Sequence, residues 1–468
     1  MNYKQVLKAK LPPSLYTGFR YIYAKTGENA KYAKAFRDTS QFLERSQWWT
    51  RSELEAYQMQ QLTHLLRHAY ENVPYYRKVF DEHYIKPGNI QNFDDLRQIP
   101  YLTKQMIQEN IEELVAGNFS KKKLEYITTG GSTGIPMGFY VEKGVTDAKE
   151  KAFMLAQWKR VGFVPGDRSA VLRGTVVRGV GPKKFWQYDP VDKTLIFSSY
   201  HMTEETLGEY VRKIREFSPA FIQAYPSAAT ILASYMKVEK VRPFKSVKAI
   251  LCGSENLYPW QRELLENAFQ CRVYSWYGHA EKAALAGECE KSCYYHIFPE
   301  YGFVELVGSD GEAVVNEDEM GEIVATGFNN YAMPLIRYRT MDLAVKSNAK
   351  CDCGRNYPLF KKVEGRLQEL IVTRNGRLIS MTAINMHSDV FDNVKQFQFY
   401  QEEKGKVVLN LVKRSTYTDR DDARIREELI KKLGRDMDLE IQFKDEILRT
   451  RNGKFRFLVQ KLPTVFGD

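Results

Sequence analysis

The most informative segment of the chain is a loop rich in glycine and hydroxyl side chains, Thr128-Thr129-Gly130-Gly131-Ser132-Thr133-Gly134-Ile135-Pro136. Glycine lets a backbone turn its N–H groups toward an anion, and serine and threonine hydroxyls add further donors. The loop lies between two strand-like segments, Leu124–Thr128 and Met137–Val141, and no Gly-Lys-Ser/Thr follows it. It is therefore not a Walker loop, which opens a helix. The pattern suits a phosphate-binding loop, but such a loop taken alone is more often a plain turn.

Predicted strands and helices alternate along the chain beyond this loop. The helices are expected at residues 146–161, 228–236 and 260–268, and the strands at residues 221–224, 249–252 and 273–276. Such alternation is typical of a layered α/β domain, the fold class that we predict. The first hundred residues are expected to be mostly helical. A stripe at helical spacing is expected to face the core there: Leu54, Leu62, Leu65, Leu66, Ala69 and Val73.

The chain changes character after Glu364. Residues 365–380 are typical of a turn leading into a hairpin, and a charged helix is expected at Asp421–Leu433 among short strands. We therefore predict two domains. Residues 1–364 would form a large N-terminal domain with a helical extension, and residues 365–468 a small α+β domain.

Composition limits the function classes. The 468 residues carry a net charge of +11, and 43% of them are hydrophobic. We find no run of about 18 apolar residues that would span a membrane and no secretory signal, so a cytoplasmic location is the expectation. The positive charge favours anionic partners such as ATP, coenzyme A or a membrane surface. Because basic residues are spread along the chain, we do not expect a nucleic-acid binder; peripheral membrane contact stays open, and the oligomeric state is not indicated.

Five segments, in order, resemble the motifs of the adenylate-forming superfamily of acyl-CoA synthetases, peptide-synthetase adenylation domains and luciferases. They are the loop at residues 128–136, Tyr277-Gly278-His279-Ala280-Glu281, Arg337-Tyr338-Arg339-Thr340-Met341-Asp342, Gly365-Arg366-Leu367-Gln368 and Asn452-Gly453-Lys454. The helical N-terminus and Cys351-x-Cys353-Gly354-Arg355 are similar to the phenylacetate–CoA ligase branch, especially to relatives found with capsular polysaccharide biosynthesis.

The resemblance implies a role for each matched residue. Lys454, Glu281 and Arg366 would be catalytic: Lys454 would bridge the substrate carboxylate and the α-phosphate, Glu281 would hold Mg²⁺, and Arg366 would lie near the nucleotide. Tyr277 would stack on adenine, and Asp342 would accept hydrogen bonds from the ribose. The other implied nucleotide-binding residues are Thr129, Gly130, Gly131, Ser132, Thr133, Gly134, Ser254, Glu255 and Gly278.

The implied activity uses ATP and Mg²⁺ to convert a carboxylic acid to an acyl-AMP, which then passes its acyl group to a thiol, with coenzyme A expected. The acyl site would be formed by Tyr225–Ser227 and Gly253–Glu255. Transfer to an amine or a carrier protein, and a degenerate nucleotide-binding protein without activity, remain the alternatives. Ala280, Met341 and Gln368 depart from the motifs, and Gln368 puts in doubt how the hinge would turn between the two half-reactions.

Five of the soft or borderline metal ligands cluster in the sequence. Cys289, Cys293 and His296 are followed by Cys351 and Cys353, while Cys252 and Cys271 stand apart. Without a signal peptide, a disulfide framework is not expected. We favour a four-coordinate structural zinc site held by Cys289, His296, Cys351 and Cys353 over free thiols. The sequence leaves open whether Cys293 replaces Cys289 or His296.

Overall fold

The computed structural model describes most of the chain. The described residues are 28–128, 137–173, 177, 185–199, 201–366, 370–376, 378–384, 389–391, 393–450 and 455–462. None of the helices in this part of the chain is long and apolar enough to cross a membrane.

The N-terminal part is helical, as predicted. Its elements are α3 (Glu28–Ser46), α4 (Arg51–Asn72), α5 (Pro74–Glu82), η1 (Pro87–Asn89), η2 (Asp94–Gln98), α6 (Lys104–Glu109) and η3 (Lys121–Lys123). Thr50 and Glu53 form a capping box that begins α4, so two otherwise unpaired donors are satisfied. The predicted stripe on α4 and at its C-cap Val73 is buried, which confirms that it faces the core.

A separate antiparallel pair, β1 (Leu124–Thr128) and β2 (Gly138–Glu142), flanks the glycine-rich loop. Thr128 faces Gly138 and Leu124 faces Glu142 in the register of this pair. The prediction of a loop between two strands is therefore confirmed at both ends. The loop itself, residues 129–136, lies outside the described residues.

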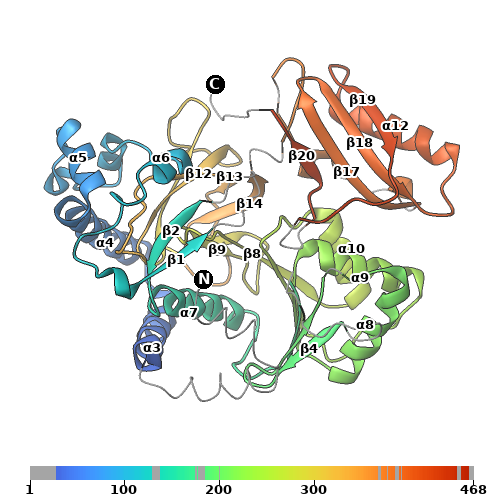
Figure 1. Cartoon of the computed structure of the whole chain (residues 1–468), viewed down its shortest axis with the longest axis horizontal. Helices are drawn as coiled ribbons and strands as arrows, with labels where there is room; N and C mark the ends of the chain where they lie inside the picture. The colour runs from blue at the N-terminus through green and yellow to red at the C-terminus, as the bar shows by residue number, and fades with distance from the viewer. Residues whose placement is uncertain are drawn as a thin grey trace.

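The largest element is a twelve-stranded sheet with the order β11-β12-β13-β14-β10-β9-β8-β7-β6-β3-β5-β4 (Figure 1). Its strands are β3 (Ser169–Leu172), β4 (Trp186–Asp189), β5 (Thr194–Phe197), β6 (Phe221–Ala224), β7 (Ala249–Gly253), β8 (Arg272–Gly278), β9 (Leu285–Gly287), β10 (Tyr295–Ile297), β11 (Gly302–Val307), β12 (Met320–Gly327), β13 (Tyr338–Ser347) and β14 (Leu359–Arg366). Strands β5, β3, β6, β7 and β8 are parallel, and the other pairings are antiparallel.

Helices cover both faces of the parallel half of this sheet. Helices α8 (Glu204–Phe217), α9 (Pro226–Val238) and α10 (Pro259–Phe269) share one apolar cluster with β3, β6 and β7. Helix α7 (Thr146–Lys159) contributes Trp158 to a second cluster with Phe221 and Leu251. Parallel sheets need this double cover because their strands are apolar on both faces. The predicted α/β fold class is thus confirmed.

The C-terminal part contains its own sheet, of order β19-β18-β17-β20. Its elements are β15 (Leu370–Val372), β16 (Leu378–Ser380), α11 (Met381–Ile384), η5 (Asp389–Phe391), β17 (Val394–Glu403), β18 (Lys406–Lys413), α12 (Asp419–Leu433), β19 (Asp438–Phe443) and β20 (Leu458–Gln460). The pairing of β15 with β16 confirms the predicted hairpin, and α12 confirms the charged helix. The boundary at residue 365 stays a prediction, because β14 carries the large sheet on to Arg366.

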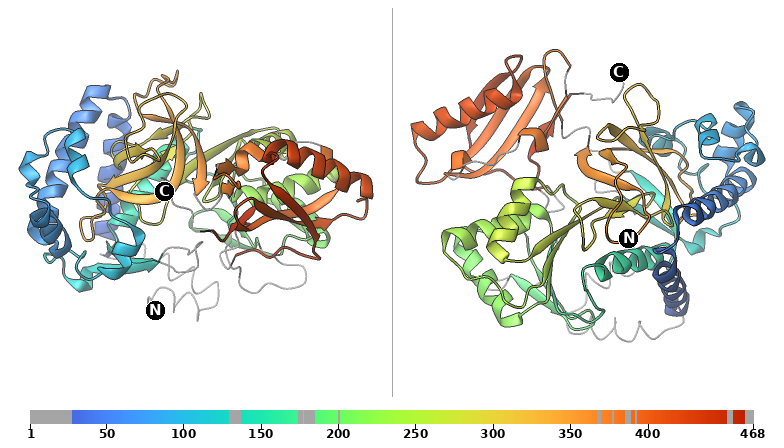
Figure 2. Two further views of the ribbon diagram at one scale, coloured as in Figure 1. Left: turned by 90° about the horizontal axis from the view of Figure 1, so that it is seen from above. Right: turned by 180° about the vertical axis from the view of Figure 1, so that it is seen from behind.

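The C-terminal sheet lies beside helix α10 and away from helices α4 and α5 (Figures 1 and 2). Aromatic side chains join the two parts: Tyr258 lies 5.5 Å from Phe457 and Trp260 lies 6.3 Å from Phe397, between ring centroids. Tyr258 is part of the apolar cluster of the C-terminal sheet. This contact places the segment after residue 455 next to the carboxyl ends of β6 and β7, where the acyl site is predicted.

Candidate active site

Two of the predicted nucleotide residues meet although they are 65 positions apart. The hydroxyl of Tyr277, near the end of β8, donates to Oδ2 of Asp342 in β13 at 2.8 Å. Burial and the neighbouring Asp342 carboxylate raise the pKa of Tyr277 well above its usual value, so the phenol stays a donor. The structure therefore brings the adenine and ribose candidates together, with the backbone of Arg366 paired to Asp342. The side chain of Arg366 lies outside the description.

The predicted magnesium ligand, Glu281, is held by two neighbours. Tyr338 donates its hydroxyl to Oε1 at 3.0 Å, and Nδ1 of His279 lies 3.1 Å from Oε2. The amide of Ala284 donates to Nε2 of the same ring at 3.2 Å, so Nδ1 carries the proton and donates to Glu281. A carboxylate with its orientation fixed in this way suits a hard cation such as Mg²⁺.

The motif residue Arg337 has a structural task. Its guanidinium donates to both carboxylate oxygens of Glu305, at 2.9 and 3.1 Å, and to the carbonyl oxygen of Ile99 at 2.7 Å. The side chain is buried, and it ties the helical N-terminal region to strand β11. This pairing gives Arg337 a structural role next to Tyr338 and Asp342 in the motif.

Met341 adopts a left-handed backbone conformation, with φ of 63°. The superfamily motif has glycine here, and glycine reaches positive φ without steric cost. Hydrogen bonds hold the strained residue in place, because its amide donates to Glu322 at 3.1 Å and the amide of Asp342 donates to Thr340 at 3.1 Å. Met341 therefore holds a left-handed conformation that a glycine at this position would reach without strain.

The predicted acyl site is joined to the C-terminal segment through Glu255. Its Oε2 accepts from the amide of Ser227 at 3.0 Å, and its Oε1 accepts from the Ser227 hydroxyl at 3.1 Å and the Phe455 amide at 3.2 Å. Arg449 donates to the Ser227 hydroxyl at 3.2 Å. The chain directly after Lys454 thus lies at the predicted site. Lys454 itself, like loop residues Thr129, Gly130, Gly131, Ser132, Thr133 and Gly134, lies outside the described residues.

Gly253 and Ser254 extend this region toward β3. A side chain at Gly253 would collide with the Trp276 ring, because a Cβ atom there would lie 2.3 Å from Nε1. Ser254 accepts a hydrogen bond from Arg173 at 2.8 Å and has φ of 67°. Glycine is therefore required at position 253, because the Trp276 ring on the neighbouring strand β8 leaves no space for a Cβ atom.

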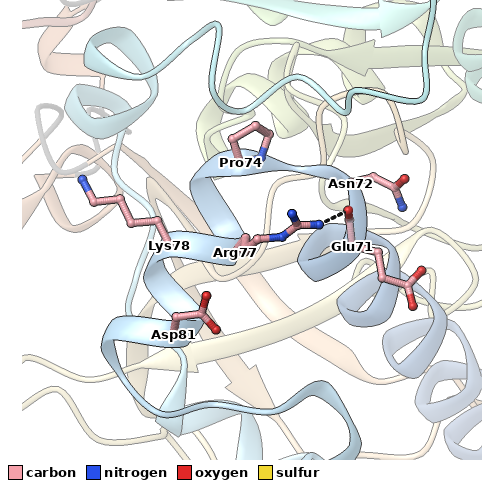
Figure 3. A pocket seen from close by; sticks show the side chains of 6 residues that line it. All are labelled: Glu71, Asn72, Pro74, Arg77, Lys78 and Asp81. Carbon is pink, nitrogen blue, oxygen red and sulfur yellow. Dashed lines mark hydrogen bonds between the residues drawn. The ribbon is translucent and has the colours of Figure 1, made fainter.

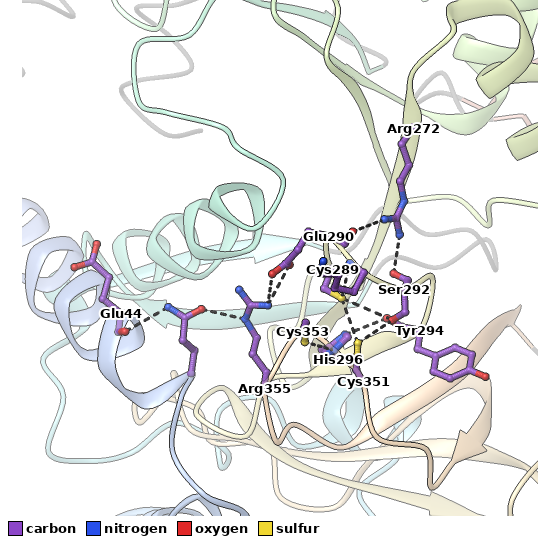
Figure 4. A network of polar contacts seen from close by, with 12 residues as sticks. Glu44, Arg272, Cys289, Glu290, Ser292, Tyr294, His296, Cys351, Cys353 and Arg355 are labelled. Atoms are coloured by element: carbon purple, nitrogen blue, oxygen red, sulfur yellow. Dashed lines mark hydrogen bonds and ion pairs between the residues drawn. The ribbon is translucent and has the colours of Figure 1, made fainter.

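The four predicted zinc ligands converge (Figure 4). The ligand atoms of Cys289, His296, Cys351 and Cys353 all lie within 4.8 Å of one another. The sulfurs of Cys289 and Cys351 are 3.5 Å apart, and the sulfur of Cys353 is 3.2 Å from Nε2 of His296. A tetrahedral zinc ion would separate its sulfur and nitrogen ligands by about 3.5–3.8 Å. The Cys289–Cys351 spacing lies within this range and the Cys353–His296 spacing is shorter, so the four side chains are close enough together to surround such an ion.

Electrostatics and outer contacts also suit a metal. The hydrogen bond with Cys353 lowers the pKa of the Cys289 thiol and raises that of Cys353. Nδ1 of His296 lies 3.1 Å from the Tyr294 carbonyl oxygen and donates to it, which leaves Nε2 directed at the thiols. Cys293 lies outside the group; it is exposed and lies 3.8 Å from Nη2 of Arg272. None of the six cysteines, all of which belong to the described part of the chain, forms a disulfide.

A surface pocket of about 380 Å³ lies at the junction of α4 and α5, away from these residues (Figure 3). Its lining consists of Glu71, Asn72, Pro74, Arg77, Lys78 and Asp81. Arg77 donates to the carbonyl oxygens of Tyr70 and Glu71, at the C-terminal end of α4. Cations stabilise helix C-termini in this way, so the pocket has a structural explanation.

Known proteins resemble the chain over most of its length. A family model described as the CapK C-terminal domain matches residues 371–461. Protein CapK of Staphylococcus aureus is 24% identical over 88% of this chain and 90% of its own length. Phenylacetate-coenzyme A ligase of Thermus thermophilus is 28% identical over 69% of this chain and 73% of its own. A structure of 2-hydroxyisobutyryl-CoA ligase with an acyl-AMP has a TM-score of 0.71 at 18% identity, covering 89% of this chain and 91% of the ligase.

The chain resembles the adenylate-forming superfamily. The sequence relatives confirm the predicted similarity to phenylacetate–CoA ligases and to protein CapK, and the solved ligase confirms the fold. Within this superfamily frame, sequence reasoning assigned no role to His279, Tyr338, Arg173 or Arg449. His279 and Tyr338 stand inside quoted motifs, so an unassigned polar side chain within a motif is the signal that would have identified them. Arg173 and Arg449 lie outside the motifs and carry no such signal.

Proposed function

We propose that the chain is an adenylate-forming ligase that activates a carboxylic acid with ATP and transfers the acyl group to coenzyme A. The observation that carries the proposal is the meeting of Tyr277 with Asp342 and of Glu281 with Tyr338, since both pairs join the same two motifs. Known phenylacetate-coenzyme A ligases among the relatives support this activity.

The chain's own residues would mainly position and neutralise charge. ATP brings the phosphate that the acid's carboxylate attacks, and such reactions depend on orientation and on stabilising negative charge. Tyr277 and Asp342 would hold the adenosine part, and residues 129–134 would hold the phosphates. Glu281, oriented by His279 and Tyr338, would bind Mg²⁺. Lys454 would contact the carboxylate and the α-phosphate.

The C-terminal part, residues 365–468, would be mobile between the two half-reactions. Gly365 has φ of 94°, a conformation that few other residues adopt, and it lies where the chain leaves the large sheet. The bond from Phe455 to Glu255 holds the chain directly after Lys454 at the large domain. Adenylation would use this arrangement, and acyl transfer would need it to open.

Zinc would have a structural task. Cys289 and His296 come from the loop around β10, whereas Cys351 and Cys353 come from the loop before β14. One ion bound by all four would join these loops. Arg355 extends the connection, because it donates to Glu290 at 3.0 Å and to Gln47 of the N-terminal region at 3.1 Å.

Pyrophosphate release with a panel of carboxylic acids, with and without coenzyme A, tests the proposal. We expect pyrophosphate release that depends on the acid, and an acyl-CoA product only when coenzyme A is present. Release without thioester formation would direct attention to an amine or carrier-protein acceptor. A folded protein that binds ATP and releases no pyrophosphate with any acid would contradict the activity.

A further inference from the structure

The amino ends of the parallel strands carry a row of exposed basic side chains. The register places the first residues of β5, β3, β6 and β7 side by side. The residues one position earlier are therefore neighbours too, and in that order they are Lys193, Arg168, Ala220 and Lys248. The amide of Lys248 donates to the carbonyl oxygen of Ala220, and the amide of Ala220 donates to that of Arg168, each at 2.8 Å. The three cations of this row are all exposed.

The loop between α9 and β7 adds further cations to this edge of the sheet. Residues 237–248 contain five basic side chains and one acidic side chain. Within the row, an aspartate directly precedes Arg168 and another precedes Lys193, so most of the excess charge comes from the loop. We call six exposed cations of the row and the loop the basic edge: Arg168, Lys193, Lys240, Arg242, Lys245 and Lys248.

The end of helix α8 holds the loop beside the row. Arg168 donates to the carbonyl oxygen of Ser218, the C-cap of α8, at 3.0 Å. Arg215, in the last turn of α8, donates to the carbonyl oxygen of Arg242 at 3.0 Å. Arg215 itself has a structural explanation, because cations stabilise the C-terminal ends of helices. That explanation does not extend to the last three cations of the loop, which lie four or more residues beyond α9.

Exposed valines accompany these cations. Val164 and Val238 are each 60% exposed, and Val191 is 39% exposed. Single exposed apolar side chains are ordinary, but each of these valines lies within four positions of a member of the basic edge. Apolar side chains beside cations are typical of a surface that lies on a membrane. The apolar groups enter the headgroup region while the cations face anionic lipids.

From these observations we propose that the basic edge binds the protein to a membrane surface that contains anionic lipids. Four of its six cations are lysines, which act as point charges and suit diffuse attraction better than the paired hydrogen bonds of a specific phosphate site. Ligands of open α/β sheets bind at the carboxyl ends of the strands, so the predicted acyl site lies at the opposite end from the basic edge. The inference goes beyond the proposed adenylation activity and does not depend on it.

Sedimentation with vesicles tests the inference with the full-length protein. Vesicles of phosphatidylcholine and phosphatidylglycerol in equal amounts are compared with vesicles of phosphatidylcholine alone. We expect binding to the mixed vesicles that high salt abolishes, because salt screens exposed charges. Arg242→Gln with Lys245→Gln and Lys248→Gln should weaken binding about a hundredfold, at about fivefold for each cation removed. Lys248→Gln alone should weaken it about fivefold, which keeps the test decisive if the triple variant fails to fold.

The valines provide a second, uncharged test. Val164→Ser with Val238→Ser should weaken binding to the mixed vesicles by about tenfold, because less apolar surface enters the headgroup region. Tighter binding to duplex DNA than to the mixed vesicles, through the same cations and without any effect of the valine substitutions, would overturn the inference in favour of a nucleic-acid surface.

Lys78→Gln with Lys86→Gln and Lys122→Gln is the matched control, because it removes the same charge from exposed positions in the N-terminal part. It should leave vesicle binding unchanged. If it weakened binding as much as the triple variant of the basic edge, total charge would be the cause and the inference would be wrong. Absence of binding to the mixed vesicles at low salt would also refute it, whatever the outcome of the adenylation assay.

Discussion

Strand β8 connects two regions that are built in different ways. At its start, Arg272 donates to the carbonyl oxygens of Glu290 and Ser292, in the loop between Cys289 and His296. At its end, Tyr277 donates to Asp342, and Glu281 follows three residues after Gly278. The first region collects thiols and an imidazole, which zinc prefers, and the second collects oxygen atoms, which magnesium prefers.

The comparison predicts which substitutions should reduce stability and which should reduce turnover. The ligands at the start of β8 bond to one another and to the loops that carry them, so their loss should reduce stability. Groups at its end face the predicted nucleotide site, so their loss should reduce turnover in a folded protein. The following substitutions test that separation, from the largest expected effect to the smallest.

Lys454→Ala should have the largest effect, because the predicted role of Lys454 is in the adenylation reaction. Removal of one preorganised charge contact to a transition state lowers rates by about a hundredfold to a thousandfold. We expect acyl-AMP formation to fall by about a thousandfold while ATP binding and thermal stability change little. Lys461→Ala, a nearby exposed lysine, is the control. Unchanged pyrophosphate release in folded Lys454→Ala protein would remove the residue from the mechanism.

The double substitution Cys351→Ser with Cys353→Ser should affect the other region. Structural zinc contributes directly to folding free energy. We expect near-stoichiometric zinc in wild-type protein purified without chelators, and loss of that zinc in the variant. The unfolding midpoint should fall by about 5 °C or more, since each kcal/mol is worth about 2–4 °C in mid-sized domains. Elemental analysis and calorimetry measure both.

Cys293→Ser controls for the loss of a thiol as such, because Cys293 is exposed and lies outside the ligand group. It should keep both zinc and stability. Wild-type protein that contains no zinc and is as stable as the double variant would show that the four side chains are free thiols, which is the alternative reading of the sequence.

Glu255→Gln should act selectively on adenylation. Its carboxylate accepts bonds from Ser227 and Phe455, and hydrogen bonds to charged groups are worth about 1.5–3 kcal/mol. The neutral amide should hold the Phe455 segment less well, so acyl-AMP formation should fall by about tenfold. Transfer from supplied acyl-AMP to coenzyme A should be nearly unchanged. Glu239→Gln, at an exposed position after α9, is the control. Equal losses in both half-reactions would mean that Glu255 does not select between them.

Much of the fold was predictable because local patterns determined it. The alternation of strand and helix at residues 221–276 predicted the bounds of β6 correctly, and it predicted both ends of β7, β8, α9 and α10 to within two residues. The antiparallel half of the sheet, β9 to β14, was not predicted. Its strands are short or pair with distant partners, such as His296 with Leu359 across 63 positions, and no local period encodes such pairings.

The candidate site was predictable in part, because its motifs are also local patterns of sequence. The ordered motifs identified Tyr277, Glu281 and Asp342, and the structure brings Tyr277 and Asp342 into contact. The motifs did not reveal that His279 and Tyr338 hold Glu281, because the first contact depends on the turn after β8 and the second joins residues 57 positions apart. The zinc ligands were chosen from spacing and resemblance, and the structure separates Cys293 from the other four by exposure.

Met341 offers the smallest effect and the finest test, because it lies next to Asp342 and yet should matter only for stability. Its φ of 63° costs a residue with a Cβ atom roughly 1–2 kcal/mol. Its side chain also packs against Leu343 and Leu370, so two effects must be separated. Met341→Ala removes the packing and keeps the strain, whereas Met341→Gly removes both. We therefore expect the glycine variant to be more stable than the alanine variant by about 1 kcal/mol in denaturant unfolding, with adenylation unchanged in both.

Ala344→Gly, in the same strand at an ordinary φ, should instead lose about 1 kcal/mol. If Met341→Gly proved less stable than Met341→Ala, the left-handed conformation would not be a source of strain. If Met341→Gly slowed adenylation, backbone strain beside Asp342 would contribute to activity. Position 341 would then affect activity as well as stability.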